Sequence, residues 1–485
     1  MGVNLPAHLV VVKGTRAWRG TTSGYQNIDQ ASLLQMIGRA GRPGFDTSGT
    51  VVIMTDNESK QKFQSLASSG LEPARSKCVD DRFVETMNAE ISQRVVTCLD
   101  TAIDWVKGTL LYVQMQSSGA TSAHTIDSHL YDLCKMAFSK LEQIGAIVVR
   151  GESVYPLAAC HVMSHNLVDY STMLQISQLP FDANQCQLLK SLSMIEGLQR
   201  PLRRSEKKSL NAAHKDVPHK LEGVPSKVRV KEPWEKAFVL FQVFIAEVAL
   251  EGNDFTLRQE MRSMVDFASR MLAAVEEYST KGTRNGNVAL QSLRLRRSLA
   301  VKLWCGRTAI LKQINGVSKS LAFQLSNHGI STFEDVVKNS NEKIEQAAGR
   351  MSPFGKDLRE AAERILQSSL TVSGSLETAH ESTIPSMLVC QIQRKVVEGL
   401  AETQSRSSGV NYTLLVYTDQ EGGCLLFEEN ITGPCEFTTA VPLRYGKIFL
   451  RLIGSVVGVD GKSTTLFAIS ANENICRCDG DIWKQ

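Results

Sequence analysis

The sequence predicts a multidomain fold of the class α/β + α + β, in which an α/β segment precedes a helical region and a β-rich region. The chain has 485 residues, which is more than one typical domain. Short β-branched runs lie near its start and helical patterns fill its middle. After residue 385 the apolar residues recur with a period of two, which is typical of half-buried strands.

The N-terminal segment predicts a strand, a helix and a second strand. The runs "HLVVVKG" (8–14) and "GTVVIMTD" (49–56) are short, apolar and β-branched, as buried parallel strands are. A helical pattern covers residues 30–39 between them. This order indicates part of an α/β domain.

The middle of the chain predicts three helices and a hairpin, followed by further helices. The helices fall within residues 83–163, and the hairpin turns at Arg150 and Gly151, which is typical of a winged helix. Residues 169–311 are mostly helical apart from a polar stretch, 211–231, that predicts a loop.

The last part of the chain predicts a small β-sandwich behind a linker. Residues 367–385 are rich in Ser and Thr, and the period-two runs "NYTLLVY" and "GCLLFEEN" follow. The predicted boundaries are 1–75 for the α/β segment, 76–164 for the winged helix, 165–310 for the helical region, 311–370 for a helix-hairpin-helix, 371–384 for the linker and 385–485 for the β-sandwich.

The composition is that of a globular protein whose basic surface, if it binds nucleic acid, is a local patch. The hydrophobic content is 42% and the net charge is only +4. No signal peptide or long apolar run predicts a membrane segment. Eleven cysteines lack a disulfide framework, which favours free thiols. The irregular spacing of Cys424, Cys435 and Cys476 argues against zinc, so no metal site is predicted.

The strongest candidate site lies in "LLQMIGRAGRPGFDTSG" (33–49). On a helix, Gln35, Arg39 and Arg42 would share one face, with Gly38 and Gly41 leaving room for a second surface. Two guanidinium forks beside glycine suit a phosphate, such as the γ-phosphoryl group of a nucleotide. The alternative is a solvated basic face, which the poor helix propensity of glycine makes less attractive.

These motifs resemble those of superfamily-two helicases. "QMIGRAGRPGFD" is similar to the last signature motif of the branch that contains RNA-exosome, spliceosomal, archaeal repair and meiotic DNA helicases, and "GVNLPAHLVVVKGT" is similar to the motif before it. "ETMNAEI" and "AIDWVKGTLLYVQM" resemble the winged-helix domain of that branch, and "IEGLQRPLRRSE" resembles its helical domain. The wording of 293–321 is most similar to the meiotic crossover DNA helicases.

The resemblance implies that residues 1–75 belong to a second RecA-like domain and that ATP with Mg is the cofactor. It assigns Arg39 and Arg42 to the ATP γ-phosphate, and Gln35 and Gly38 to the surface that faces the nucleotide. The paired arginines beside glycine suit a phosphate on chemical grounds as well.

The resemblance also implies contacts with nucleic acid in the same segment. Gly2 and Asn4 would couple nucleic acid to nucleotide. The stretch 13–29 occupies the place of a strand-separating β-hairpin, in which Trp18 and Tyr25 would stack on the end base pair. An ordinary surface loop is the alternative.

A basic helical pattern, 287–307, occupies the place of the ratchet helix that follows single-stranded nucleic acid in this family. Arg294 and Arg297 would contact phosphates, and Trp304 would stack on a base or, alternatively, belong to the core. Gly316 lies in a predicted tight turn of a helix-hairpin-helix, whose amides suit a phosphate, although a plain helical hairpin is also compatible.

Half of the expected ATP site is missing from the sequence. No P-loop or acidic motif occurs, and "GSVVGVDGKSTTLF" fails because Val456 stands where the first glycine is needed. Its "DG" predicts a hairpin turn instead. We therefore expect the chain to be the C-terminal portion of a longer helicase, lacking the first motor domain and inactive alone.

The function that the resemblance implies is that of a nuclear, ATP-dependent, 3′–5′ DNA helicase acting in meiotic recombination and crossover formation. Its expected partners are single-stranded and branched DNA, with a protein partner possible through the β-sandwich and no membrane. A non-enzymatic nucleic-acid-binding fragment and an RNA helicase of the spliceosome or exosome branch are the alternatives.

Overall fold

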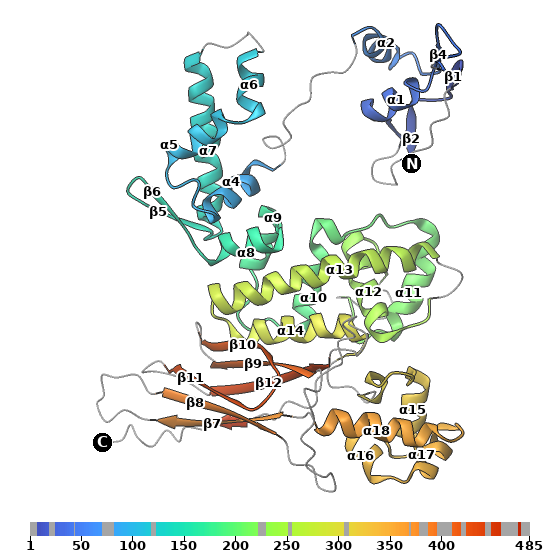
Figure 1. Cartoon of the computed structure of the whole chain (residues 1–485), viewed down its shortest axis with the longest axis vertical. Helices are drawn as coiled ribbons and strands as arrows, with labels where there is room; N and C mark the ends of the chain where they lie inside the picture. Colours follow the sequence, from blue (N-terminus) through green and yellow to red (C-terminus); the bar gives the residue numbers. More distant parts are fainter. Residues whose placement is uncertain are drawn as a thin grey trace. The chain divides into compact units, whose positions relative to one another are not determined.

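The computed structural model of the chain shows a mixed fold of helices and sheets (Figure 1). The chain divides into two compact units: one contains Met1–Phe83, Ile103–Asp132 and Pro201–Ser205, and the other contains Val84–Ala102, Leu133–Arg200 and Glu206–Gln485. The structure describes residues 7–18, 25–42, 44–69, 82–117, 123–221, 229–250, 255–304, 310–367, 370–377, 387–394, 410–418, 423–441, 448–456 and 474–476.

The N-terminal segment contains the predicted strand, helix and strand. Strands β1 (Leu9–Val12) and β4 (Thr50–Ile53) pair in parallel, and α1 (Gln30–Ile37) lies between them in sequence. A small core of Val12, Leu33 and Phe63 holds them together. The remaining elements are the antiparallel strands β2 (Arg16–Trp18) and β3 (Tyr25–Asn27) and helix α2 (Lys60–Ser69).

The expectation that both parallel strands are buried is wrong. Leu9 is 52% exposed, Val11 50% and Val52 44%. The described sheet has only these two strands, so the side chains that do not reach the core of α1 and α2 remain open to solvent. β-branched composition therefore predicted the strands but not their burial.

The predicted helices and hairpin follow, with one difference. The second of the predicted helices, over "TAIDWVKGTLLYVQM" (101–115), is two helices, because Gly108 ends the first of them by donating its amide to the carbonyls of Asp104 and Trp105. The hairpin turns at Gly151, whose φ of 61° suits glycine. The elements are α4 (Phe83–Ser92), α5 (Leu99–Lys107), α6 (Leu110–Ser117), α7 (Ala123–Gln143), β5 (Ile147–Arg150) and β6 (Ser153–Pro156).

Two polar side chains of "ETMNAEIS", the half-buried Glu85 and the buried Asn88, fix α4 to the helices after the hairpin. Glu85 accepts the amide of Tyr170 at 2.8 Å, and Asn88, which is 1% exposed, donates to the carbonyl of Cys160 at 3.0 Å. Buried polar groups of this kind need such partners. This part of the resembling motif therefore has a packing role.

The helical region contains seven α-helices within the described residues, and α12, α13 and α14 supply about half of its buried apolar side chains. The expected loop at 211–231 is partly helix, because α11 continues to Asp216. The helices are α8 (Ala158–Asn166), α9 (Tyr170–Ser177), α10 (Gln185–Met194), α11 (Lys207–Asp216), α12 (Pro233–Ala246), α13 (Phe255–Glu277) and α14 (Gly286–Val301), with the short helices η1 (Glu196–Leu198), η2 (Arg204–Glu206) and η3 (Tyr278–Gly282).

Four helices and a short turn come next, and their core is continuous with that of the β-sandwich. Ser318, Thr332 and Ser340 begin three of these helices, each accepting a backbone amide three residues on. The elements are η4 (Ile310–Gln313), α15 (Lys319–Asn327), α16 (Phe333–Lys338), α17 (Asn341–Ala348) and α18 (Phe354–Gln367).

Two sheets form the C-terminal region, with strand orders β10-β9-β12-β13 and β11-β8-β7. The linker expected at 371–384 is wrong in its first half, because these residues continue β7, in which Leu370 and Val372 enter the core. The strands are β7 (Leu370–Glu377), β8 (Met387–Arg394), β9 (Val410–Thr418), β10 (Cys424–Ile431), β11 (Cys435–Ala440), β12 (Ile448–Val456) and β13 (Asn474–Cys476).

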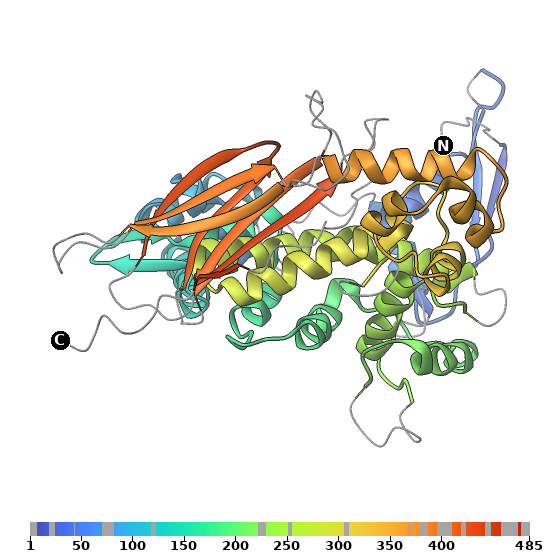
Figure 2. The same ribbon diagram turned by 90° about the horizontal axis from the view of Figure 1, so that it is seen from below.

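Helix α14 lies between α13 and the four-stranded sheet, as Figures 1 and 2 show. Ala289, Leu290 and Leu293 pack against Leu415 and Tyr417 of β9. The approach is so close that a Cβ on Gly286 would lie 2.1 Å from the Cβ of Tyr417. Within the described residues, no helix is long and apolar enough to cross a bilayer.

Candidate nucleotide and nucleic-acid sites

The first candidate site is the segment that follows α1. Gly38 ends the helix by donating to the carbonyl of Leu34 at 2.8 Å. The chain then runs beside Ala7, whose amide donates to the carbonyl of Arg39 at 3.0 Å and whose carbonyl accepts the amide of Gly41 at 2.8 Å. The expectation that Gln35, Arg39 and Arg42 share one helical face is therefore wrong, because α1 ends at Ile37 and both arginines lie beyond the helix.

The glycines of this segment have a local reason. Gly41 has a φ of 93°, which a residue with a Cβ rarely adopts. A Cβ on Gly49 would lie 2.6 Å from the nitrogen of Gly41 and 2.7 Å from the carbonyl carbon of Ala40. These contacts, within one chain, explain the glycines without a second surface.

Arg42 is held by the aspartate of the same motif. Its Nε donates to Oδ2 of Asp46 at 2.7 Å and its Nη2 donates to Oδ1 at 2.8 Å, which is the bidentate geometry of an arginine–carboxylate pair. Hydrogen bonds from the Arg42 side chain lower the pKa of Asp46 to about 2. The same hydrogen bonds raise the pKa of Arg42. The pair fixes the plane of an exposed guanidinium group.

Arg39 has different surroundings. Together with Met36 it lines an open cavity of about 360 Å³ whose opposite wall is the strand segment Val10–Gly14. Gln35 and Gly38 are exposed beside it, whereas Arg42 does not line this cavity. The structure thus places both arginines at the surface, only one of them in a hollow.

The other predicted residues of this segment are only partly described. A hairpin is present, because Trp18 of β2 pairs with Tyr25 of β3. The side chains of Trp18 and Tyr25, and the whole of Gly2 and Asn4, lie outside the described residues. Their assignment to nucleic acid remains a prediction.

The expectation that Arg297 contacts nucleic acid is wrong for this structure. Arg297 is 7% exposed, and its Nη2 donates to Oγ1 of Thr413 in β9 at 3.0 Å. Its neighbour Arg296 donates to both carboxylate oxygens of Glu276, at 3.1 and 2.9 Å. Of the three arginines Arg294, Arg296 and Arg297, Arg294 is the one that remains a candidate for contact with nucleic acid, and its side chain is half-buried. The basic residues of α14 mostly serve contacts with α13 and the sheet.

Trp304 belongs to the core, the alternative already recognised from the sequence. It is 6% exposed, and its ring meets that of His219 edge-on with 5.2 Å between centroids. Burial of this kind excludes stacking on a base in this structure. Gly316 lies at an exposed turn with a φ of 89°, as predicted, and α15 begins three residues later.

Helix α13 carries an exposed basic face that was not predicted from the sequence. Arg258, Arg262 and Arg270 are all exposed, while Met264, Ala268 and Met271 on the opposite side are buried. Arg258 and Arg262 are one turn apart, and Arg270 follows two turns later, so they share a broad face. The spacing of these arginines was the signal that could have found them.

Within the part of the chain that the structure describes, no group of three His, Cys, Asp or Glu side chains is arranged to hold a metal ion. Seven cysteines of the described residues are not joined in disulfides. The whole of the "GVDGKST" stretch (458–464) lies outside the described residues, beyond the end of β12.

Comparisons with known proteins agree with the resemblance. The family described as "Sec63 Brl domain" matches residues 156–430. The chain is 28% identical to "ATP-dependent DNA helicase homolog MER3" from Arabidopsis thaliana, over 98% of this chain and 43% of that protein. It is 27% identical to human "Probable ATP-dependent DNA helicase HFM1", over 87% of this chain and 29% of that protein.

A splicing protein matches a shorter part of the chain. "Pre-mRNA-splicing factor brr2" from Schizosaccharomyces pombe is 30% identical over 62% of this chain and 14% of its own length. The chain therefore spans less than half the length of each of these three curated relatives.

Proposed function

This chain belongs to the Sec63 Brl domain family, and on that premise we propose that it is part of an ATP-dependent DNA helicase that acts in meiotic recombination. The observation that carries the proposal is the similarity to a DNA helicase homologue over 98% of this chain. A nuclear location and 3′–5′ polarity follow from the same resemblance. The match to the splicing factor covers 62% of the chain, which favours the DNA helicase over the RNA helicase.

In this proposal Arg39 and Arg42 face the ATP γ-phosphate, with Gln35 and Gly38 on the same surface. Their exposure and the cavity beside Arg39 support it, since guanidinium donors are what a phosphate needs. Asp46 holds the plane of Arg42, so that little side-chain freedom remains to be lost on binding. Bound ATP supplies the γ-phosphoryl group, and the arginines stabilise the negative charge that develops there.

Magnesium and the rest of the nucleotide need groups that this chain does not offer. No P-loop or acidic motif occurs in the sequence. A first motor domain would supply both. In a protein with that domain, Arg39→Ala or Arg42→Ala should lower kcat more than ATP affinity, because the arginines act on charge that develops in the transition state.

We place the nucleic-acid path on the exposed face of α13, since α14 is covered on both sides. Arg258, Arg262 and Arg270 supply the charge, and Phe255, which is 72% exposed at the start of the helix, supplies an apolar surface. Arginine contacts and a stacking surface are typical of single-strand binding. Arg294, Gly316, Gly2 and Asn4 remain candidate contacts, and Trp18 and Tyr25 remain candidates for strand separation.

The finer architecture is part of the proposal. Four helices (α4 to α7) and a hairpin support a winged helix at 76–164, and two packed sheets support an immunoglobulin-like sandwich. The strand β7 moves the start of that sandwich to residue 370. The other domains of the proposed architecture are the RecA-like part (1–75), the helical ratchet domain (165–310) and the helix-hairpin-helix (311 to the start of β7). A protein partner would bind the sandwich.

The test is binding of the 485-residue chain to labelled single-stranded DNA and to RNA of the same length, measured by fluorescence anisotropy. We expect affinity that falls with salt, and no ATP hydrolysis by this chain alone. Absence of DNA binding at low salt would contradict the proposal. Stronger binding to RNA would favour the RNA helicase. If the chain binds DNA but takes no part in a longer ATPase, the alternative of a non-enzymatic nucleic-acid-binding fragment is favoured.

A further inference from the structure

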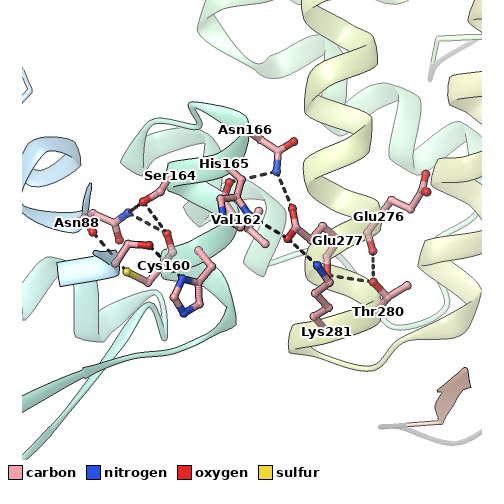
Figure 3. Close-up of polar contacts among 12 residues, drawn as sticks. Asn88, Cys160, Val162, Ser164, His165, Asn166, Glu276, Glu277, Thr280 and Lys281 are labelled. Atoms are coloured by element: carbon pink, nitrogen blue, oxygen red, sulfur yellow. Dashed lines mark hydrogen bonds and ion pairs between the residues drawn. The ribbon is translucent and has the colours of Figure 1, made fainter. Parts of the chain in front are cut away.

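Helix α13 ends in two adjacent glutamates that bind different parts of the molecule (Figure 3). Glu277 faces α8: its Oε2 accepts from Nδ2 of Asn166 at 2.9 Å, and its Oε1 lies 3.4 Å from Nδ1 of His165. Lys281, one turn on, donates to the same Oε1 at 3.0 Å. Although burial alone would raise it, hydrogen bonds from Lys281 and Asn166 lower the pKa of Glu277.

Glu276 faces the other way. It is 4% exposed and accepts both hydrogen bonds of Arg296 in α14. Nη2 of Arg296 also lies 3.6 Å from Oε1 of Glu429 in β10. A buried carboxylate is costly unless it is paired and hydrogen-bonded, so this contact determines where α14 lies against α13.

The helix α8 is itself fixed to α4. Nδ2 of Asn88 donates to Oγ of Ser164 at 3.1 Å as well as to the carbonyl of Cys160. Polar contacts therefore join α4 to α8 and α8 to the end of α13 (Figure 3). Glu276 extends them to Arg296 of α14, which lies near Glu429 of β10.

The turn after α13 satisfies the carbonyls that the helix end leaves open. The residues Tyr278–Gly282 form a π-helical turn, a feature often found at functional sites. Oγ1 of Thr280 donates to the carbonyls of Glu276 and Glu277, at 2.9 and 3.1 Å. Gly282 is required because a Cβ there would lie 2.8 Å from the ring of Tyr278. The π-helical turn thus fixes the backbone carbonyls of both glutamates.

We propose that Glu276 and Glu277 are positioning residues that fix α13 to α8 on one side and to α14 and β10 on the other, and so set the position of its exposed arginine face. The inference rests on the proposed function, because that face is the proposed nucleic-acid contact. Neither glutamate touches nucleic acid in this account.

Hydrogen–deuterium exchange of the full chain tests the two contacts separately. Glu277→Ala should speed amide exchange in α8 by at least about tenfold and leave β9 unchanged. Glu276→Gln should speed exchange in α14 and β10 and leave α8 unchanged. Glu277→Gln, which keeps an acceptor for Asn166, should have a smaller effect than Glu277→Ala and keeps the test valid if the alanine variant fails to fold. Glu142→Ala, on the exposed face of α7, is the matched control.

Binding to single-stranded DNA separates a positioning role of the glutamates from a purely electrostatic effect, because the two predict opposite changes in affinity. Removing a negative charge near basic residues should strengthen binding if electrostatics alone matter. If the glutamates position α13, Glu277→Ala should instead weaken binding several-fold, while Glu142→Ala should not weaken it.

Unchanged exchange in α8 and α14 would overturn the inference, as would stronger DNA binding by Glu277→Ala. If the unaltered chain does not bind DNA, the proposed function fails. The exchange experiment then still decides whether the glutamates hold the three elements together.

Discussion

Replacement of Trp304 tests whether this tryptophan is a core residue or stacks on a nucleic-acid base. The side chain is 6% exposed and packs edge-on against His219. Truncation of a buried tryptophan costs about 3–5 kcal/mol, of which an aromatic pair of this kind contributes roughly 0.5–1.5 kcal/mol. Nε1 of Trp304 is buried without a hydrogen-bond partner among the described residues, so Trp304→Phe should cost less than Trp304→Ala.

The assay is thermal unfolding of Trp304→Ala, Trp304→Phe and, as control, Trp234→Ala, whose side chain is only half-buried. With about 2–4 °C per kcal/mol, Trp304→Ala should lower Tm by roughly 6–20 °C in the transition that includes α12–α14. Its affinity for single-stranded DNA, measured below that transition, should stay close to that of the unaltered chain. An unchanged Tm together with weaker DNA binding would show that the tryptophan stacks on a base and would refute the reasoning.

Three further outcomes are expected. Gly286→Ala should destabilise the chain by about 1–3 kcal/mol, although alanine favours helices, because its Cβ would meet Tyr417; a stabilised variant would contradict the close contact between α14 and β9. The Asp46 carboxyl should titrate near pH 2 by NMR, and its pKa should return toward about 3.9 in Arg42→Ala. An unchanged pKa in that variant would contradict the pairing of Asp46 with Arg42. Burial lowers the pKa of His214, whose Nε2 accepts the amide of Leu221 at 3.0 Å. Stability that is present at pH 7 should therefore be lost as the pH falls below the ordinary histidine pKa of about 6.5. The His214→Gln variant should lack that part of the pH dependence.

Local patterns predicted the elements well where the elements depend on local residues. The strand, helix and strand of the N-terminal segment and the hairpin at Gly151 are present. The period-two runs also form strands. Each of these follows from β-branched runs, turn residues or helical spacing within a few positions. Burial of β1 and β4 did not follow, since it depends on the neighbours of the sheet.

Errors arose where a distant residue decides the outcome. Arg296 and Arg297 look like a solvated basic face until Glu276 and Thr413, 20 and 116 residues away, are seen to bind them. Helix α1 ends at Ile37, before Arg39, and the chain that follows pairs with Ala7. Nothing in the spacing of arginines within one segment reveals such partners.

The ATP site could be predicted only as far as its motif reaches. The sequence indicated Arg39 and Arg42 through their spacing and resemblance, and the structure adds the bidentate contact of Arg42 with Asp46. An aspartate four residues away is a common helical pattern, so its role as the partner of Arg42 was not evident from the sequence.

The most direct test of the central claim compares the salt dependence of single-stranded DNA binding for three triple variants. Arg258, Arg262 and Arg270 of α13 are replaced by glutamine in the first, and Arg294, Arg296 and Arg297 of α14 in the second. Exposed lysines of α11, namely Lys207, Lys208 and Lys215, are replaced in the control. Each phosphate contact contributes a slope of about −0.7 in log affinity against log salt. We expect the α13 variant to flatten the slope by roughly two and the control to leave it unchanged. The α14 variant should lose stability and change the slope by less than about one. A flattened slope in the α14 variant alone, with α13 silent, would contradict the central claim.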